Sequence, residues 1–312
     1  MKFFPTPKKK WIVYFVILFT FLLALEIYLR FYWGFCDNVL MMANDKYEYI
    51  AQPNQHRFRF RNHIDINSYS QRSAEPDSSS FIILGLGDSV IGGGVMVDQD
   101  SLATERLSRS LSLHLGRKVQ VLNVGAGSWG PDNCYAYVKE NGDFTAKIAF
   151  LLVSSHDAFD NMDFKPVIDK VNRYESSQYK LALWELFKKY ALPRLKGKFG
   201  VFEAPPGAKG KTFNSGFLNL ATYFKSKGVP FFIFLHPDQD ELKSREFNYM
   251  GKEIIHFCDS MKIPLYLQPF NSLSEEDYRG IIHMNNSGQE KMAANLFPIL
   301  YQYADSLIKH HE

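Results

Sequence analysis

The sequence predicts an α/β domain with three layers (α/β/α), in which a parallel β-sheet lies between helices, preceded by one transmembrane helix. Short apolar runs alternate with helical patterns from residue 81 onward, and strands separated by helices form parallel sheets covered on both faces. Glycine-rich turns follow the first two of these runs, and the N-terminal segment is strongly apolar. The chain has 312 residues, enough to bury a core of its own.

The N-terminal segment is predicted to be a signal anchor. Three lysines at positions 8–10 precede an apolar stretch at 11–33, and a helix needs roughly 20 such residues to cross a bilayer. By the positive-inside rule, residues 1–10 lie in the cytoplasm, and the rest lies on the extracytoplasmic (periplasmic) side of the cytoplasmic membrane. A cleaved signal peptide is the alternative, but the apolar stretch is long and no small-residue cleavage pattern follows it.

Residues 34–79 are predicted to form a polar, membrane-proximal connector. Within it, residues 57–61 alternate arginine and phenylalanine, a pattern typical of a strand with one buried face. The arginines either bind phosphate or glycan groups or line the solvated face of an edge strand. Residues 73–80 contain Pro76 and several serines, which indicates a loop leading into the core.

The main domain is predicted to span residues 80–312. Its strands are expected at 82–84, 119–122, 148–153, 229–235 and 263–267. Helices are expected at 100–115, where leucines recur at helical spacing, from Pro131 onward, and at 285–308.

An insertion is predicted at residues 160–212, between the third and fourth strands. It contains an amphipathic helix, because Leu181, Trp184, Phe187 and Tyr190 recur every third residue. Basic residues then accumulate, namely Lys188, Lys189, Arg194, Lys196, Lys198, Lys209 and Lys211. The insertion is either a lid or surface facing an anionic lipid or polymer, or an ordinary solvated insert.

Composition excludes several classes of protein. The formal net charge is only +3, which does not suggest a nucleic-acid partner. The three cysteines are far apart, so they form neither a disulfide scaffold nor a zinc motif. No cluster of Asp, Glu and His has metal-ligand spacing, and therefore no metal site and no cofactor are predicted.

The chemistry is predicted at the turn 87–89, Gly-Asp-Ser, which ends the first strand. Open α/β sheets place reactive groups at this edge. Ser89 is the candidate nucleophile, and His283, just before the last helix, is the general base that a hydroxyl nucleophile requires. The turn at Ser128 can present backbone N–H groups to an oxyanion, with His156 or Asn123 as side-chain donors. Alternatively, Ser89 only caps a strand-to-helix turn.

With these residues in view, the chain resembles the SGNH/GDSL hydrolase family over residues 80–308. Residues 87–89 match the first block of that family, and residues 123–130 are similar to the second. Residues 154–157 resemble the third block and 280–283 the fifth. The resemblance implies a flavodoxin-like parallel sheet and a serine esterase, with Ser89 as nucleophile and His283 as base.

The chain also departs from the family pattern. His156 stands where the family has asparagine, Ser128 stands at its oxyanion-hole glycine, and Gly280 replaces the triad aspartate. The resemblance still implies that Ser128 and His156 form the oxyanion hole. A Ser-His dyad is the default expectation, and Asp157 or Asp277 are the candidates for carboxylate support of His283.

We therefore expect a membrane-anchored, extracytoplasmic serine esterase or O-acyltransferase. Location and family analogy suggest O-acetyl groups of cell-envelope or exported polysaccharide as its substrate. The alternative is a weakened or inactive module that binds an acylated glycan or a partner in polysaccharide assembly. The missing aspartate and asparagine motivate this second hypothesis.

Overall fold

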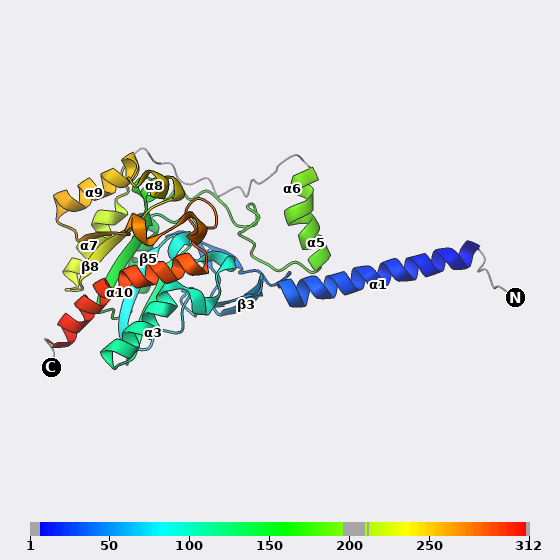
Figure 1. The fold of residues 1–312 in the computed structure, drawn as a ribbon, viewed down its shortest axis with the longest axis horizontal. Coiled ribbons are helices and arrows are strands. Elements are labelled where there is room, and N and C mark those ends of the chain that lie inside the picture. Colours follow the sequence, from blue (N-terminus) through cyan, green and yellow to red (C-terminus); the bar gives the residue numbers. More distant parts are fainter. Residues whose placement is uncertain (1–6, 196–209, 211, 310–312) are drawn as a thin grey trace.

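The computed structural model describes residues 7–195, 210 and 212–309. One α/β domain carries a long N-terminal helix that projects away from it (Figure 1). The predicted fold class is confirmed. Part of the predicted cytoplasmic segment, residues 1–6, lies outside the described residues. So do four lysines of the predicted basic insertion, at positions 196, 198, 209 and 211.

The N-terminal helix α1 spans Pro7–Trp33. Its stretch Lys10–Trp33 is long and apolar enough to cross a membrane, and most of its large side chains are exposed. The end of α1 nearest the domain contacts a second helix. Both carboxylate oxygens of Glu26 accept backbone N–H groups, from Ala182 and Leu183, at 2.8 Å each. The Arg30 side chain donates to Glu26 and to the Lys180 carbonyl.

The predicted connector is folded into two β-hairpins. Strand β1 (Met41–Asn44) pairs with β2 (Glu48–Ala51), and β3 (Gln55–Arg59) pairs with β4 (Asn62–Ile66), both antiparallel. The connector is therefore part of the domain surface rather than a loose spacer.

One expectation for this connector is wrong. Arg59 does not lie on a solvated face, because it is only 2% exposed and donates to Glu185 Oε1 at 2.7 Å. The same carboxylate accepts the backbone N–H of Cys36 and the side-chain amide of Asn38. A buried charge of this kind is stable only when it is paired and hydrogen-bonded. Arg59 is thus a structural residue.

The central sheet has five parallel strands in the order β6-β5-β7-β8-β9. They are β5 (Phe81–Gly87), β6 (Val119–Gly125), β7 (Ile148–Ser154), β8 (Phe231–His236) and β9 (Leu265–Leu267). This is the flavodoxin-like order 2-1-3-4-5, whose switch point lies where β5 separates β6 from β7. The carboxyl end of β5 is therefore the expected position of a site.

Helices cover both faces of the sheet (Figure 1). On one face, α3 (Ala103–Leu115) and α10 (Asn286–Lys309) pack on alternate residues such as Ile83 and Phe150. On the other, α4 (Pro131–Asn141), α7 (Gly216–Ser226) and α9 (Tyr249–Met261) pack on Ile82 and Leu151. The short helix α8 spans Gln239–Ser244. Both cores bury continuous apolar strands, which is typical of a parallel sheet.

The predicted insertion contains the expected helix. It runs as α5 (Ala182–Leu186), a π-helical turn (Phe187–Ala191) and α6 (Leu192–Leu195). Figure 1 shows this segment beside the domain-proximal end of α1, running across its direction.

Candidate active site

Ser89 and His283 meet at the carboxyl edge of the sheet. Ser89 is the first residue of α2 (Ser89–Gly92), directly after β5, and His283 lies in the loop before α10. The distance between His283 Nε2 and Ser89 Oγ is 2.9 Å, a hydrogen-bond distance. The fold thus brings together two residues that are 194 positions apart.

The turn at residues 87–89, which carries the candidate nucleophile Ser89 and is called the nucleophile turn below, is held by side chains from several elements. Asp88 Oδ1 accepts the N–H of Val90 at 2.7 Å. The amide of Asn123 donates to the Ile91 carbonyl at 2.7 Å, and that of Gln289 donates to the Val90 carbonyl at 3.2 Å. These bonds fix the backbone around Ser89. Asn123, an expected oxyanion donor, is instead buried and used in this support.

Arg72 also holds this region, and sequence reasoning did not identify it. Its buried guanidinium donates to the carbonyls of Gly92, Gly94 and Val97 at 2.8, 2.6 and 2.6 Å. These carbonyls belong to the loop that follows Ser89. Nothing in the local sequence around this arginine indicates that its side chain hydrogen-bonds to a loop some 20 residues later.

The second glycine-rich turn lies against the nucleophile turn. A Cβ atom on Gly125 would come within 2.7 Å of the Gly87 and Asp88 carbonyl oxygens, so no side chain fits there. The hydroxyls of Tyr49 and Tyr174 both donate to the Gly127 carbonyl, at 2.8 and 3.0 Å. Ser128 follows with φ 59°, in the left-handed region. Its oxyanion role stays a prediction.

The loop that carries His283 is rigidly positioned. Arg279 N–H donates to the His283 carbonyl at 2.7 Å, which closes a tight turn. The buried His236 side chain lies 3.2 Å from the Ile282 carbonyl through Nε2 and 2.7 Å from Gln268 Oε1 through Nδ1. Burial lowers the pKa of His236, so it is neutral. His236 therefore supports the loop rather than the reacting atoms.

Asp277 does not support His283. Its carboxylate accepts from the Ser274 backbone and side chain, from Ser287 and from Lys291. Burial works against its charge, but these hydrogen bonds lower the pKa of Asp277. The carboxylate caps the local turn and ties it to α10.

Asp157 does not reach His283 either. Its Oδ2 accepts the Ser154 N–H at 2.7 Å, and its Oδ1 faces His156. Within the described part of the chain, no carboxylate oxygen lies within 4 Å of His283, and its side-chain hydrogen bond is the one to Ser89. The arrangement is a dyad.

The protonation state of His283 suits a base. Burial lowers the pKa of His283, and the positive charges of Arg279 and Arg173 act in the same direction, while Asp88 opposes them. The imidazole is therefore neutral near pH 7 and can accept the Ser89 proton.

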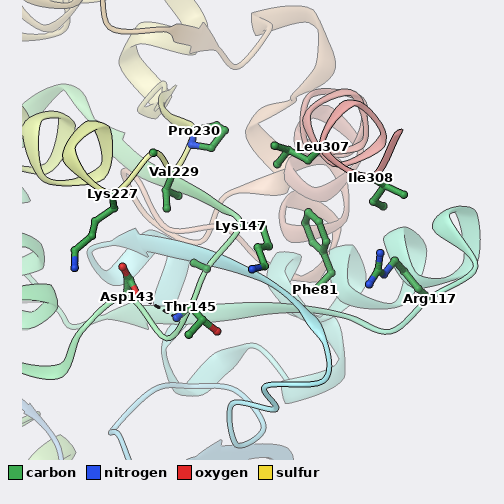
Figure 2. A pocket seen from close by; sticks show the side chains of 12 residues that line it. Phe81, Arg117, Asp143, Thr145, Lys147, Lys227, Val229, Pro230, Leu307 and Ile308 are labelled. Atoms are coloured by element: carbon green, nitrogen blue, oxygen red, sulfur yellow. Dashed lines mark hydrogen bonds between the residues drawn. The ribbon is translucent and has the colours of Figure 1, made fainter. Parts of the chain in front are cut away.

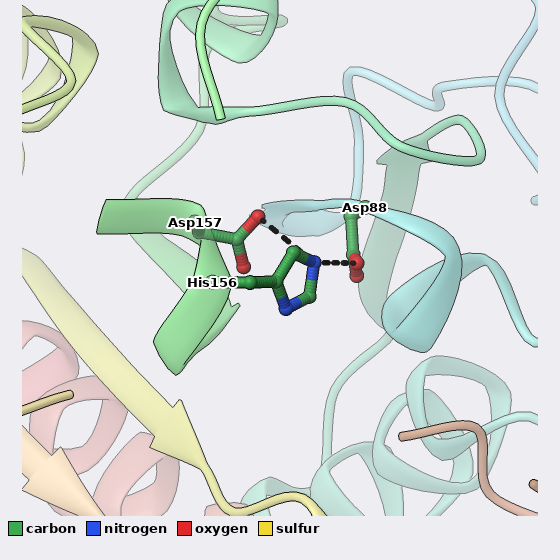
Figure 3. Close-up of side chains that lie close together, drawn as sticks. All are labelled: Asp88, His156 and Asp157. Carbon is green, nitrogen blue, oxygen red and sulfur yellow. Dashed lines mark ion pairs between the residues drawn. The ribbon is translucent and has the colours of Figure 1, made fainter. Parts of the chain in front are cut away.

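His156 lies in a different environment on the same edge (Figure 3). Its Nε2 is 3.6 Å from Asp88 Oδ2, 3.7 Å from Asp157 Oδ1 and 3.6 Å from Asp160 Oδ2. Burial alone would lower its pKa, but these three carboxylates raise the pKa of His156 to about 10. Because His156 Nε2 faces carboxylates, these carboxylates favour the protonated ring over the neutral one that the sequence predicted; the oxyanion role of His156 stays a prediction. Asp88, His156 and Asp157 thus gather in space although they show no metal-ligand spacing in the sequence.

A pocket among the described residues lies elsewhere. Its volume is about 670 Å³, and its lining includes Phe81, Lys147 and Pro230, at the amino ends of β5, β7 and β8 (Figure 2). Ser89 lies at the opposite, carboxyl end of β5. This pocket is therefore separate from the dyad.

No protein-family model and no curated protein matches the chain. The chain is similar in structure to the lipase/acylhydrolase from Enterococcus faecalis, with 12% identity, 71% of this chain and 95% of that chain covered, and a TM-score of 0.42. A member of the lipolytic G-D-S-L family from Veillonella parvula has 13% identity, 70% and 97% coverage, and a TM-score of 0.38. A psychrotrophic esterase from Pseudoalteromonas has 9% identity, 72% and 100% coverage, and a TM-score of 0.41.

Proposed function

We propose that this protein is a serine esterase of the SGNH type that uses a Ser89–His283 dyad. The observation that carries the proposal is the 2.9 Å contact between Ser89 Oγ and His283 Nε2. A serine hydroxyl becomes a nucleophile only when a base removes its proton, and a neutral imidazole at this distance can do so. The bonds that fix both loops pre-organise the pair.

The reaction follows from these positions. Ser89 Oγ attacks the ester carbonyl carbon while His283 Nε2 takes the hydroxyl proton. The C–O bond to the alcohol then breaks, and His283 returns the proton to the leaving oxygen. Water, deprotonated by His283, attacks the acyl-serine and releases the acid. If a sugar hydroxyl replaces water, the product is a new ester and the enzyme is an acyltransferase.

We place the dyad on the extracytoplasmic side of the cytoplasmic membrane, with α1 as a single-pass anchor. The support is the apolar length of α1 and the lysines that precede it. Two exposed aromatic side chains also support this placement. Trp184 in α5 is 51% exposed and Phe187 in the π-helical turn after it is 39% exposed, and this segment contacts Glu26 of α1. Aromatic side chains in such positions favour the headgroup region.

The substrate we propose is an ester, for example an O-acetyl group, on a cell-envelope or exported glycan. A tethered hydrolase acts on substrates near the membrane, and this is the argument for the glycan. A second candidate is a glycan- or partner-binding module without turnover. The observation that favours it is the absence of a carboxylate within 4 Å of His283 among the described residues.

The test is ester turnover by the full-length protein in detergent micelles. We expect hydrolysis of a chromogenic acetyl ester that is lost in Ser89→Ala and His283→Ala. Ser226→Ala, an exposed serine on α7, is the matched control and should retain it. Turnover equal in the wild type and Ser89→Ala would contradict the esterase and support the binding module.

A further inference from the structure

Three side chains that the esterase reaction does not use converge next to the nucleophile turn. Asp88 follows β5, while His156 and Asp157 lie in the 3₁₀ turn Ser155–Ala158 after β7. Because β5 and β7 are parallel neighbours, these residues meet at the same edge of the sheet. Figure 3 shows both carboxylates beside the His156 ring.

Two of the carboxylate oxygens that face His156, Asp88 Oδ2 and Asp157 Oδ1, are buried and lack hydrogen bonds. Asp88 and Asp157 are each 1% exposed, and neither Asp88 Oδ2 nor Asp157 Oδ1 has a hydrogen-bond partner among the described residues. Their distances to His156 Nε2, 3.6 and 3.7 Å, exceed the 2.7–3.2 Å of an N–H···O bond. A buried carboxylate oxygen without a hydrogen bond lowers the stability of the fold, and a bound ligand would remove this cost.

The other oxygen of each carboxylate is already fixed. Asp88 Oδ1 accepts from Val90 N–H and Asp157 Oδ2 from Ser154 N–H, both at 2.7 Å. This is the arrangement of metal ligands whose second oxygen is held by the protein so that the first points at the ion. The free atoms Asp88 Oδ2, Asp157 Oδ1 and His156 Nε2 all lie within 4.8 Å of one another.

The distances from His156 Nε2 to the two carboxylate oxygens, 3.6 and 3.7 Å, are close to those between atoms that share a tetrahedral ion. Zinc binds imidazole nitrogen and carboxylate oxygen at roughly 2.0–2.2 Å, which places neighbouring ligands about 3.3–3.6 Å apart. We infer that Asp88, His156 and Asp157 form a binding site for a divalent cation of the zinc type. Asp160 Oδ2, also 3.6 Å from His156 Nε2, or a water fills the fourth position.

Charge supports the same conclusion. Two buried carboxylates, Asp88 and Asp157, face one imidazole, so a dication balances them better than a single proton does. In the metal-free form a proton on His156 takes this role. The two forms exclude each other, because Nε2 cannot hold a proton and a metal at once.

The site does not depend on the proposed esterase function, although Asp88 directly precedes Ser89. Metal binding is expected to persist in Ser89→Ala, where ester turnover is lost. Failure of one proposal can therefore be told from failure of the other.

The experiment uses the full-length protein in detergent micelles after removal of metals by a chelator. Co²⁺ and Zn²⁺ are titrated separately, and visible absorption and calorimetry are recorded. We expect one equivalent of each metal, with the intense d–d bands of tetrahedral cobalt, and a higher melting temperature with zinc. His156→Ala and the isosteric Asp157→Asn should weaken binding more than about tenfold, with folding checked by circular dichroism.

The matched control is His56→Ala, which removes an exposed histidine paired with Asp65 at 2.8 Å. It should bind metal like the wild type. Absence of cobalt bands in the wild type, or zinc binding that is unchanged in both His156→Ala and Asp157→Asn, would overturn the inference.

Discussion

His283 and His156 lie at the same edge of the sheet, and their surroundings differ in charge. His283 contacts a serine hydroxyl and has no carboxylate within 4 Å among the described residues, whereas His156 faces three carboxylates. Burial lowers the pKa of His283, and negative charge raises the pKa of His156. Environment, not residue type, therefore makes one histidine neutral and suited to act as a base, and favours the charged form of the other.

The largest effect that should separate the two histidines is on ester turnover. His283→Ala is expected to lower kcat/KM by about 10²–10⁴-fold, because it removes the general base. The measurement is steady-state hydrolysis of an acetyl ester. The matched control is His236→Gln, at the histidine that supports the loop, and it should lower kcat/KM far less than His283→Ala does. Equal losses in both variants would show that His283 acts only through loop structure.

The pH profile sharpens the comparison. Activity requires neutral His283, whose pKa lies below the ordinary 6.5 because of burial and of Arg279 and Arg173. Asp88 and His156, the other charged groups near it, act in opposite directions on this pKa. We expect kcat/KM to be constant from about pH 7 down to this lowered pKa, and then to fall about tenfold per pH unit. A midpoint above 6.5 would contradict the structure.

Restoring a carboxylate near His283 should make the two histidines more alike. Gly280 has open space around its Cβ position, although its φ of 96° disfavours a side chain. Gly280→Asp is expected to raise the pKa of His283 and to increase kcat about tenfold, at a cost of about 1 kcal/mol in stability. Gly280→Asn, which lacks the charge, is the control. An equal gain with asparagine would rule out an electrostatic cause.

The smallest effect concerns Asp277. Asp277→Asn weakens the bonds from Lys291, Ser274 and Ser287 and should lower the free energy of unfolding by about 1–2 kcal/mol. Turnover by the folded protein should change little, and chemical denaturation with an activity assay checks both. A large loss of kcat with unchanged stability would mean that Asp277 serves the dyad.

The sequence predicted the sheet well because buried parallel strands are continuous apolar runs. It ended the first strand at residue 84, whereas β5 continues to Gly87. The glycine at 85 looks like a turn, but it makes room for the Phe150 ring, which would lie 2.8 Å from a Cβ atom there. Such a contact depends on a neighbouring strand and is not visible locally.

Contacts between distant residues explain the other differences. Arg59 was expected in solvent because its partner, Glu185, lies 126 residues away. The cluster of Asp88, His156 and Asp157 was not predicted for the same reason, since these residues show no ligand spacing in the sequence. Ser89 and His283 were found because a strand-end serine and a histidine before the last helix are local patterns at a common edge.

The central claim is that Ser89 is a nucleophile activated by His283. The most direct measurement is covalent labelling of the full-length protein with a fluorophosphonate at pH 7, followed by mass spectrometry of the intact chain and its peptides. The account predicts one adduct on the peptide that contains Ser89, none there in Ser89→Ala, and labelling slowed more than about 100-fold in His283→Ala. A folded protein that takes up no adduct, or one labelled equally fast without His283, would contradict it.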